Sequence, residues 1–294
     1  YGTINSNVLL LGDDSFYHYG TIGGNVFLHE SYEGDLFMKN GSSITGQITN
    51  DGGNFVATMG TGTLDITGGM TRTEEGRGNF LIGYNASDKG TVNIKSNVAK
   101  QNITVGYTNN PNLPNVLNVT DGSALIDDSV IRVNNGSTLN ANASKITNST
   151  IQNNGNLNFN GGTNANAITG TGTLGVSGAF VNNATINQAS LTLADEANFT
   201  SYEDITLSNS ADITNSGSFT LNGANLDIGT ANIINNGTMS MDGSSYLTAG
   251  NLTNNAGHYL TIRNPNSLNL SGTFTNGGDV FLQGTLPEGF AITR

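Results

Sequence analysis

The chain has 294 residues and a formal net charge of −12, and its 46 Asn, 40 Gly and 36 Thr make up about two residues in five. Because these residues are poor helix formers and Cys is absent, the composition excludes a helical bundle, a disulfide scaffold and a Cys-ligated zinc site. The ten Lys and Arg form no cluster, which argues against nucleic acid as a partner, and no run approaches the ~20 apolar residues of a transmembrane helix.

Aromatic side chains gather near the N-terminus. Residues 16–37 contain six of the 21 Phe and Tyr and two of the three His. Such rings often anchor binding surfaces, because they bury a large area with few rotatable bonds. One interpretation is therefore an exposed binding patch with Tyr17, His18, Tyr19 and Tyr32 as contact residues. The other is a wider core that the Phe side chains fill and the Tyr side chains cover.

A loose repeat follows in the middle of the chain. Phe-Leu-Ile-Gly-Tyr at 80–84 returns as Ile-Thr-Val-Gly-Tyr at 103–107, 23 residues further on. Each copy is followed by a short apolar strand, at 90–94 and at 115–119. The repeat unit is therefore expected to be longer here than in the C-terminal third.

Two segments of this region are expected to protrude as loops, 71–78 and 109–114. Loops on a rigid scaffold frequently carry binding residues. The first loop contributes the candidates Glu74, Glu75 and Arg77, and the second contributes Asn110 and Asn112.

The C-terminal third contains a regular repeat. An Asn-x-Gly unit followed by an apolar-x-apolar triplet occurs four times, at steps of 20 or 21 residues. The triplets are Phe219-Thr220-Leu221, Met239-Ser240-Met241, Leu260-Thr261-Ile262 and Val280-Phe281-Leu282. Two further apolar series keep similar steps: Leu226, Leu247 and Leu268, and Ile233, Leu252 and Phe274. The two-residue period of each triplet indicates a strand with one buried face.

These repeats predict an all-β fold, a parallel β-helix with three short strands per coil, about 20–21 residues per coil and roughly 11–13 coils. Neighbouring coils would stack equivalent apolar residues in columns. Asn and Gly are expected at the corners because both tolerate the left-handed backbone conformation. Stacked Asn side chains are expected to hydrogen-bond between coils.

Several segments resemble passenger domains of bacterial autotransporters, most closely the AIDA-like, self-associating adhesins. They are 60–69, 80–83 with 90–94, and 118–123. The resemblance covers roughly residues 41–285, and related coils occur in filamentous haemagglutinin-type exoproteins. It implies a right-handed, single-stranded parallel β-helix displayed on the cell surface. Display would depend on an outer-membrane translocator in a C-terminal region missing from this chain.

On this basis we expect an aromatic-rich first segment at 1–40, the β-helix passenger at 41–285 and a C-terminal tail at 286–294. The resemblance implies a virulence-associated adhesin that mediates aggregation and biofilm formation or attachment to a host. The partner would be a like molecule or a host surface protein or glycan. A repetitive polar side face and the protruding loops would make the contact, with no cofactor and no catalysis.

Two other functions remain open. One is a carbohydrate-active β-helix enzyme, a polysaccharide lyase or a tailspike-like glycosidase. Glycosidases need two carboxyl groups on one face, whereas adjacent acids such as Glu74 and Glu75 point to opposite faces of a strand. No Gly-x-Ser-x-Gly elbow is present. The other is a passive stalk that lifts a distal binding tip off the membrane.

We predict no metal site. The chain lacks the Gly-Gly-x-Gly-x-Asp repeat of calcium-binding solenoids, although the acid pairs 13–14 and 127–128 leave an isolated calcium open. His18 and His29 are expected to be ordinary packed or surface histidines.

Overall fold

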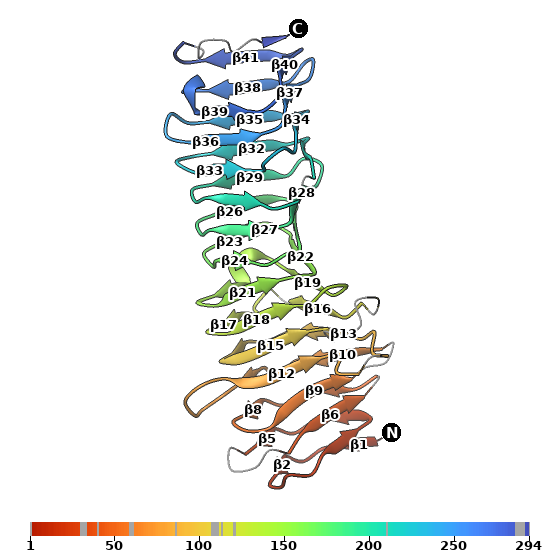
Figure 1. Ribbon diagram of the computed structural model, residues 1–294. Coiled ribbons are helices and arrows are strands. Elements are labelled where there is room, and N and C mark those ends of the chain that lie inside the picture. The colour runs from red at the N-terminus through yellow and green to blue at the C-terminus, as the bar shows by residue number, and fades with distance from the viewer. Residues whose placement is uncertain are drawn as a thin grey trace. The chain divides into compact units, whose positions relative to one another are not determined.

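The structure is a computed structural model that describes residues 2–29, 34–39, 41–58, 62–85, 87–106, 112, 114–119, 122–209, 211–285 and 292–293. The chain divides into two compact units, Tyr1–Leu157 (unit 1) and Asn158–Arg294 (unit 2). The described residues are strands and turns, apart from two 3-10 helices, η1 (Ala143–Lys145) and η2 (Pro265–Ser267). Figure 1 shows the strands of each unit in stacked rows.

Unit 1 contains three sheets, and each of their paired strands is parallel to its neighbours. Sheet A holds β1 (Gly2–Ile4), β4 (Gly20–Ile22), β7 (Ser43–Ile44), β10 (Thr63–Ile66), β13 (Thr91–Ile94), β16 (Val116–Val119) and β19 (Thr138–Ala141). Sheet B holds β2 (Val8–Leu10), β5 (Val26–Leu28), β8 (Ile48–Asn50), β11 (Met70–Thr71), β14 (Val98–Ala99), β17 (Ile126–Asp127) and β20 (Ile146–Thr147). Sheet C holds β3 (Phe16–His18), β6 (Leu36–Lys39), β9 (Asn54–Thr58), β12 (Gly78–Ile82), β15 (Gln101–Val105), β18 (Val130–Val133) and β21 (Thr150–Asn153). Strand β22 (Asn156–Phe159) includes the boundary between the units.

Unit 2 is also built from parallel pairs. Its sheet A strands are β25 (Thr173–Val176) and β28 (Ser190–Leu193). Its sheet C strands are β24 (Ile168–Thr169), β27 (Ile186–Gln188), β30 (Ile205–Leu207), β33 (Asn225–Asp227), β36 (Tyr246–Ala249) and β39 (Leu268–Leu270). Sheet D holds β23 (Gly162–Asn164), β26 (Ala179–Asn182), β29 (Asn198–Ser201), β32 (Ser218–Leu221), β35 (Thr238–Met241), β38 (Tyr259–Ile262) and β41 (Asp279–Leu282). Sheet E holds β31 (Ile213–Asn215), β34 (Ile233–Asn235), β37 (Leu252–Asn254), β40 (Phe274–Asn276) and β42 (Ile292–Thr293).

The chain is therefore a parallel β-solenoid with three strands per coil and about 13 turns, as the repeats predict. Coil length is less uniform than expected. In unit 1, Gly2 pairs with Gly20 across a short coil, whereas Val98 pairs with Ile126 across a much longer one. In unit 2 the lengths vary less, between the short step from Thr173 to Ser190 and the longer step from Leu252 to Phe274. The longer coils lie in the middle of the sequence, as predicted.

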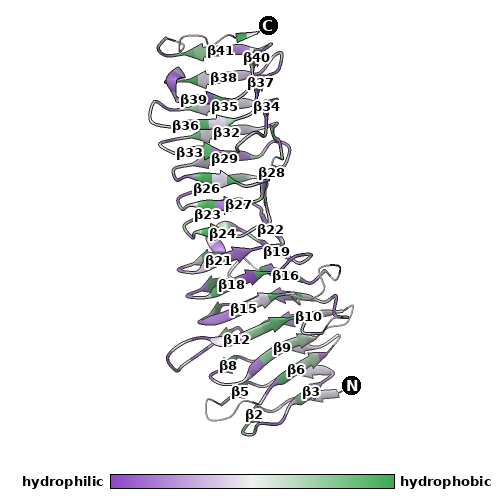
Figure 2. Ribbon diagram, in the orientation of Figure 1, coloured by the Kyte–Doolittle hydropathy of each residue, from purple (hydrophilic) through white to green (hydrophobic). Residues whose placement is uncertain are grey.

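The predicted apolar columns are confirmed. Phe219 pairs with Met239, Met239 with Leu260, and Leu260 with Val280. The other two series, starting at Leu226 and at Ile233, also stack in register. Phe159, Phe180, Phe199 and Phe219 form a stack in unit 2 with ring centroids 5.0–5.6 Å apart. Each such side chain is at most 1% exposed and contributes roughly 1.5–3 kcal/mol by burial. Apolar residues, green in Figure 2, occur in strands along both units.

A row of buried asparagines also connects the coils of unit 2, as expected. The Nδ2 of Asn215 donates to Asn235 Oδ1 at 2.8 Å, Asn235 Nδ2 to Asn254 Oδ1 at 2.7 Å, and Asn254 Nδ2 to Asn276 Oδ1 at 2.8 Å. The first three side chains are at most 1% exposed. Because an amide carries both donors and acceptors, each Asn satisfies its neighbours above and below.

The glycines that precede the triplets were expected to adopt a left-handed backbone conformation, and two of them do not. Neither Gly217 nor Gly237 has a positive φ. A Cβ at Gly237 would instead collide with the carbonyl oxygen of Gly217, and a Cβ at Gly217 with that of Ala197. Glycine is needed there because successive coils approach each other closely, whereas Gly257, with φ of 81°, fits the left-handed explanation.

Candidate binding surfaces

An aromatic cluster lies on the outer face of sheet C in unit 1. Leu36 and Met38 are fully buried in the interior, so alternation along β6 directs Phe37 outward. Tyr17, its register partner, stacks on Phe37 with centroids 4.6 Å apart and planes 13° apart. Tyr84 meets Phe37 edge-on at 5.8 Å. We call Tyr17, Phe37, Lys39 and Tyr84 the aromatic patch.

The patch combines the two interpretations of the aromatic segment. Phe37 is only 6% exposed and Tyr17 covers it, as in the covered-core interpretation. Yet Phe37 lies outside the solenoid interior, and so does Phe27, which alternates with the buried Val26 and Leu28. Tyr17 remains 53% exposed, as a binding residue requires.

The other candidates of the aromatic segment are His18, Tyr19 and Tyr32. His18 points inward, is 8% exposed and stacks with Phe16 at 6.1 Å. Among the described groups its Nε2 has no hydrogen-bond partner. Tyr19 is 43% exposed, and Tyr32 lies outside the described residues.

The loop that carries Glu74 and Glu75 is anchored from the preceding coil. Asp51 Oδ1 accepts hydrogen bonds from the backbone nitrogen of Thr73 at 2.7 Å and, more weakly, from that of Glu74 at 3.4 Å. The Nε of Arg72 donates to the carbonyl oxygen of Glu75 at 3.0 Å. The loop thus presents both glutamates to solvent.

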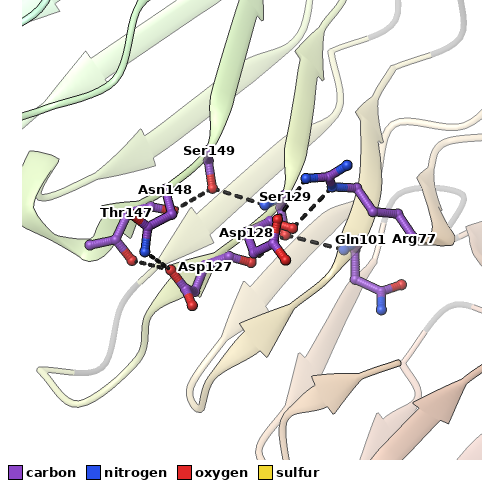
Figure 3. Close-up of polar contacts among 8 residues, drawn as sticks. All are labelled: Arg77, Gln101, Asp127, Asp128, Ser129, Thr147, Asn148 and Ser149. Carbon is purple, nitrogen blue, oxygen red and sulfur yellow. Dashed lines mark hydrogen bonds and ion pairs between the residues drawn. The ribbon is translucent and has the colours of Figure 1, made fainter. Parts of the chain in front are cut away.

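Arg77, the third candidate of that loop, pairs with a residue 51 positions away. Its Nη2 lies 2.6 Å from Asp128 Oδ1, and its Nε donates to the Asp128 carbonyl oxygen at 3.0 Å (Figure 3). Gly78 pairs with Gln101 one coil on, so Arg77 reaches past a whole coil. The pair ties these coils together at the corner between sheets B and C.

The acid pair Asp127 and Asp128 lies at the same corner. Asp127 Oδ1 accepts from Thr147 Oγ1 at 2.7 Å and from Asn148 Nδ2 at 2.9 Å (Figure 3). The bonds from Thr147 and then Asn148 hold the pKa of Asp127 below its ordinary value. Asp128 and Asn148 both have positive φ, which turns the chain at equivalent points of successive coils. Both carboxylates are therefore engaged in structural contacts.

The second loop is described only at two positions, Asn112 and Pro114. Asn112 is exposed, and Asn110 lies outside the described residues. Across the described part of the chain, no three His, Asp or Glu side chains come together in a group able to hold a metal ion.

A repetitive polar surface lies on four adjacent strands of sheet D in unit 2. Its outward residues are Asn198, Thr200, Ser218, Thr220, Thr238, Ser240, Tyr259 and Thr261, on β29, β32, β35 and β38. We call this set the hydroxyl face. It carries no charge, and strand pairing spaces its rows about 4.8 Å apart. Within the described structure its Thr and Ser hydroxyls make no hydrogen bond to the protein, so all of them are available to a partner.

The hydroxyl face could have been predicted from the sequence, from the residue between the two apolar residues of each triplet. The middle residue of each apolar-x-apolar triplet points outward, and in three successive triplets it is Thr220, Ser240 and Thr261. Tyr84, by contrast, joins the aromatic patch because β6 pairs with β9 and β9 with β12, and no local pattern indicates that pairing. Lys39 lies two residues after Phe37 on β6 and therefore on the same outer face.

The fold and these surfaces define a parallel β-solenoid with a repetitive uncharged face and a separate aromatic patch. No protein-family model, no curated protein and no solved structure matches the chain. No described helix is long and apolar enough to cross a membrane.

Proposed function

We propose that this chain is an adhesive passenger of the autotransporter type, displayed at a bacterial surface, and that the hydroxyl face makes the contact. The observation that carries the proposal is the row of in-register hydroxyl groups without partners in the described protein. A flat, repeated surface of this kind suits contact with another long molecule better than it suits catalysis.

The energetics favour contact with a like surface. One net hydrogen bond contributes only about 0.5–1.5 kcal/mol. Two hydroxyl faces lying along each other would form many such bonds with little repulsion, because the face is uncharged although the chain carries −12. Weak individual contacts and strong combined contacts are what reversible cell–cell aggregation requires.

The test is display of the chain on a non-aggregating bacterium, followed by measurement of cell sedimentation. We expect aggregation with the wild-type chain and its loss in a Thr220→Glu, Thr261→Glu variant. A matched control is Thr214→Glu, Thr253→Glu, which adds the same charge at the same two-coil spacing on the outer face of sheet E. Both variants are compared by circular dichroism.

Three results would refute the proposal. Equal loss of aggregation in both variants would show an effect of net charge rather than of the face. Absence of aggregation and of surface attachment in the wild type would leave the chain as a stalk, and release of reducing ends from polysaccharides would make it an enzyme.

A further inference from the structure

The outer column of sheet C in unit 1 changes character along the coils. In register order it runs Tyr17, Phe37, Val56, Leu81, Thr104, Arg132 and Gln152. An outward column that faces water is normally polar, as its last three members are. The first four are apolar, and Val56 is fully buried although it points away from the interior. The first coils therefore carry a second, smaller apolar cluster on the outside.

Two residues of the aromatic patch, Tyr17 and Tyr84, are exposed to a partner. The Tyr17 ring packs on Phe37 and is still 53% exposed, and Tyr84 is 45% exposed. The Nζ of Lys39 lies 5.2 Å from the centroid of the Tyr17 ring and 5.8 Å from that of Phe37. No described carboxylate pairs with Lys39: the two ion pairs in the described structure are Arg77–Asp128 and Lys95–Asp65. An ammonium that pairs with no described carboxylate therefore lies beside an exposed aromatic ring.

The position of Tyr84 is fixed in advance. Asp88, only 5% exposed, accepts hydrogen bonds from the backbone nitrogens of Tyr84 at 3.1 Å and of Asn85 at 2.9 Å. Asn115, itself fully buried, donates to the carbonyl oxygen of Asp88 at 3.1 Å. These bonds hold the backbone at Tyr84, and the edge-on contact with Phe37 orients the ring, which lowers the entropic cost of binding.

We propose that the aromatic patch binds a carboxylate-bearing sugar, a pyranose residue of an acidic glycan. The apolar C–H face of a pyranose is complementary to the electron-rich face of a Tyr ring. The Lys39 ammonium supplies the single positive charge that pairs with one carboxylate, and the phenol hydroxyls of Tyr17 and Tyr84 can hydrogen-bond sugar hydroxyls. A densely sulphated chain would need several cations, which the patch does not have. This site goes beyond the proposed function and is independent of the hydroxyl face.

The experiment titrates the whole chain with methyl α-glucuronide and with methyl α-glucoside, followed by NMR. The two probes differ only in the carboxylate. We expect the glucuronide to bind about three- to fivefold more tightly, the gain typical of an exposed ion pair. Lys39→Met should bring the two affinities together, whereas the control Lys95→Met, on the coil segment that follows β13 of sheet A, should leave the ratio unchanged. Tyr17→Leu should weaken binding of both probes.

Equal affinity of wild type for the two probes, or an unchanged ratio in Lys39→Met, would overturn the proposal. So would absence of binding by a wild type that is folded by circular dichroism. If Tyr17→Leu then reduced cell aggregation, the patch would belong to contacts between copies of the chain instead. The hydroxyl-face variants should bind the glucuronide normally, so failure of one proposal leaves the other testable.

Discussion

Replacement of Asn235 by Ala is the most direct test of the buried asparagine row. Asn235 is fully buried, and its Nδ2 donates to Asn254 Oδ1 at 2.7 Å and to the Tyr259 carbonyl oxygen at 3.0 Å. Its Oδ1 accepts from Asn215, whose Nδ2 keeps a second partner, the Thr238 carbonyl oxygen at 3.0 Å. Asn235 also makes two weaker bonds to Gly237, from Nδ2 to its carbonyl oxygen at 3.3 Å and to Oδ1 from its backbone nitrogen at 3.4 Å. The Gly237 carbonyl oxygen keeps the backbone nitrogen of Tyr259 as a donor, so the substitution mainly removes a donor from the other two acceptors and spares the Asn215 donor.

The expected cost follows from those losses. A buried polar group without a partner costs about 1–3 kcal/mol, so the loss of one donor to each of two acceptors predicts a decrease of about 2–5 kcal/mol in the free energy of unfolding. The neighbouring Asn236 is the control, because its side chain accepts one exposed bond, from Asn255 at 2.6 Å. Asn236→Ala should cost no more than about 0.5 kcal/mol.

Urea denaturation followed by circular dichroism measures both values. The reasoning fails if Asn235→Ala and Asn236→Ala destabilise the chain equally. Equality would mean that water or local rearrangement satisfies the exposed acceptors, and that the row does not connect the coils energetically. A selective loss for Asn235→Ala would establish that it does.

Three further outcomes are expected. Gly237→Ala should destabilise by about 3 kcal/mol, because its methyl group would meet the carbonyl oxygen of the preceding coil, whereas Gly243→Ala, with open space around it, should be neutral in the same denaturation assay. Because the pKa of Asp127 is lower in the folded than in the unfolded chain, its carboxylate stabilises the fold above the unfolded pKa, and this stability is lost as pH falls through the folded pKa. Below about pH 4 the Tm of the wild type should therefore fall more than the Tm of Asp127→Asn. Equal decreases in Tm would contradict this. The half-exposed Arg77–Asp128 pair should show a coupling energy of at most about 1 kcal/mol in a double-mutant cycle, and a larger value would indicate a desolvated pair.

The interior of the solenoid was predictable because stacking imposes its period on the sequence. Residues that share a column, such as Phe219, Met239 and Leu260, must all be apolar, and the spacing between them is the coil length. The turn before Leu260 is longer than the turn before Met239, and the two residues still pair in register. Varied coil lengths in unit 1 weaken the period there, so the same reasoning identified fewer columns.

The surface contacts were not predictable in the same way. Leu36, Phe37 and Met38 are all apolar, so β6 has no alternation to show which residue points outward; only pairing with Tyr17 decides it. Arg77 was expected beside the glutamates of its own loop, yet its partner Asp128 lies 51 residues away. That distance is the sum of two coils of unequal length, which no local pattern contains.

The hydroxyl face has a competing explanation, namely that Thr is simply favoured in strands. If strand propensity alone chose the outward residues, every outward column of the same coils would have a similar composition. The outward column of sheet C in unit 2 includes Asn187, Thr206, Asp227 and Thr248, so a charge is accepted there. The hydroxyl face has no charged residue on four successive strands, and the next strand, β41, places Asp279 in register with Tyr259. Strand propensity explains the threonines of both columns, and each column accepts one acid, Asp227 in sheet C and Asp279 in sheet D. The aggregation of the Thr220→Glu, Thr261→Glu variant is therefore the measurement that separates propensity from contact with another surface.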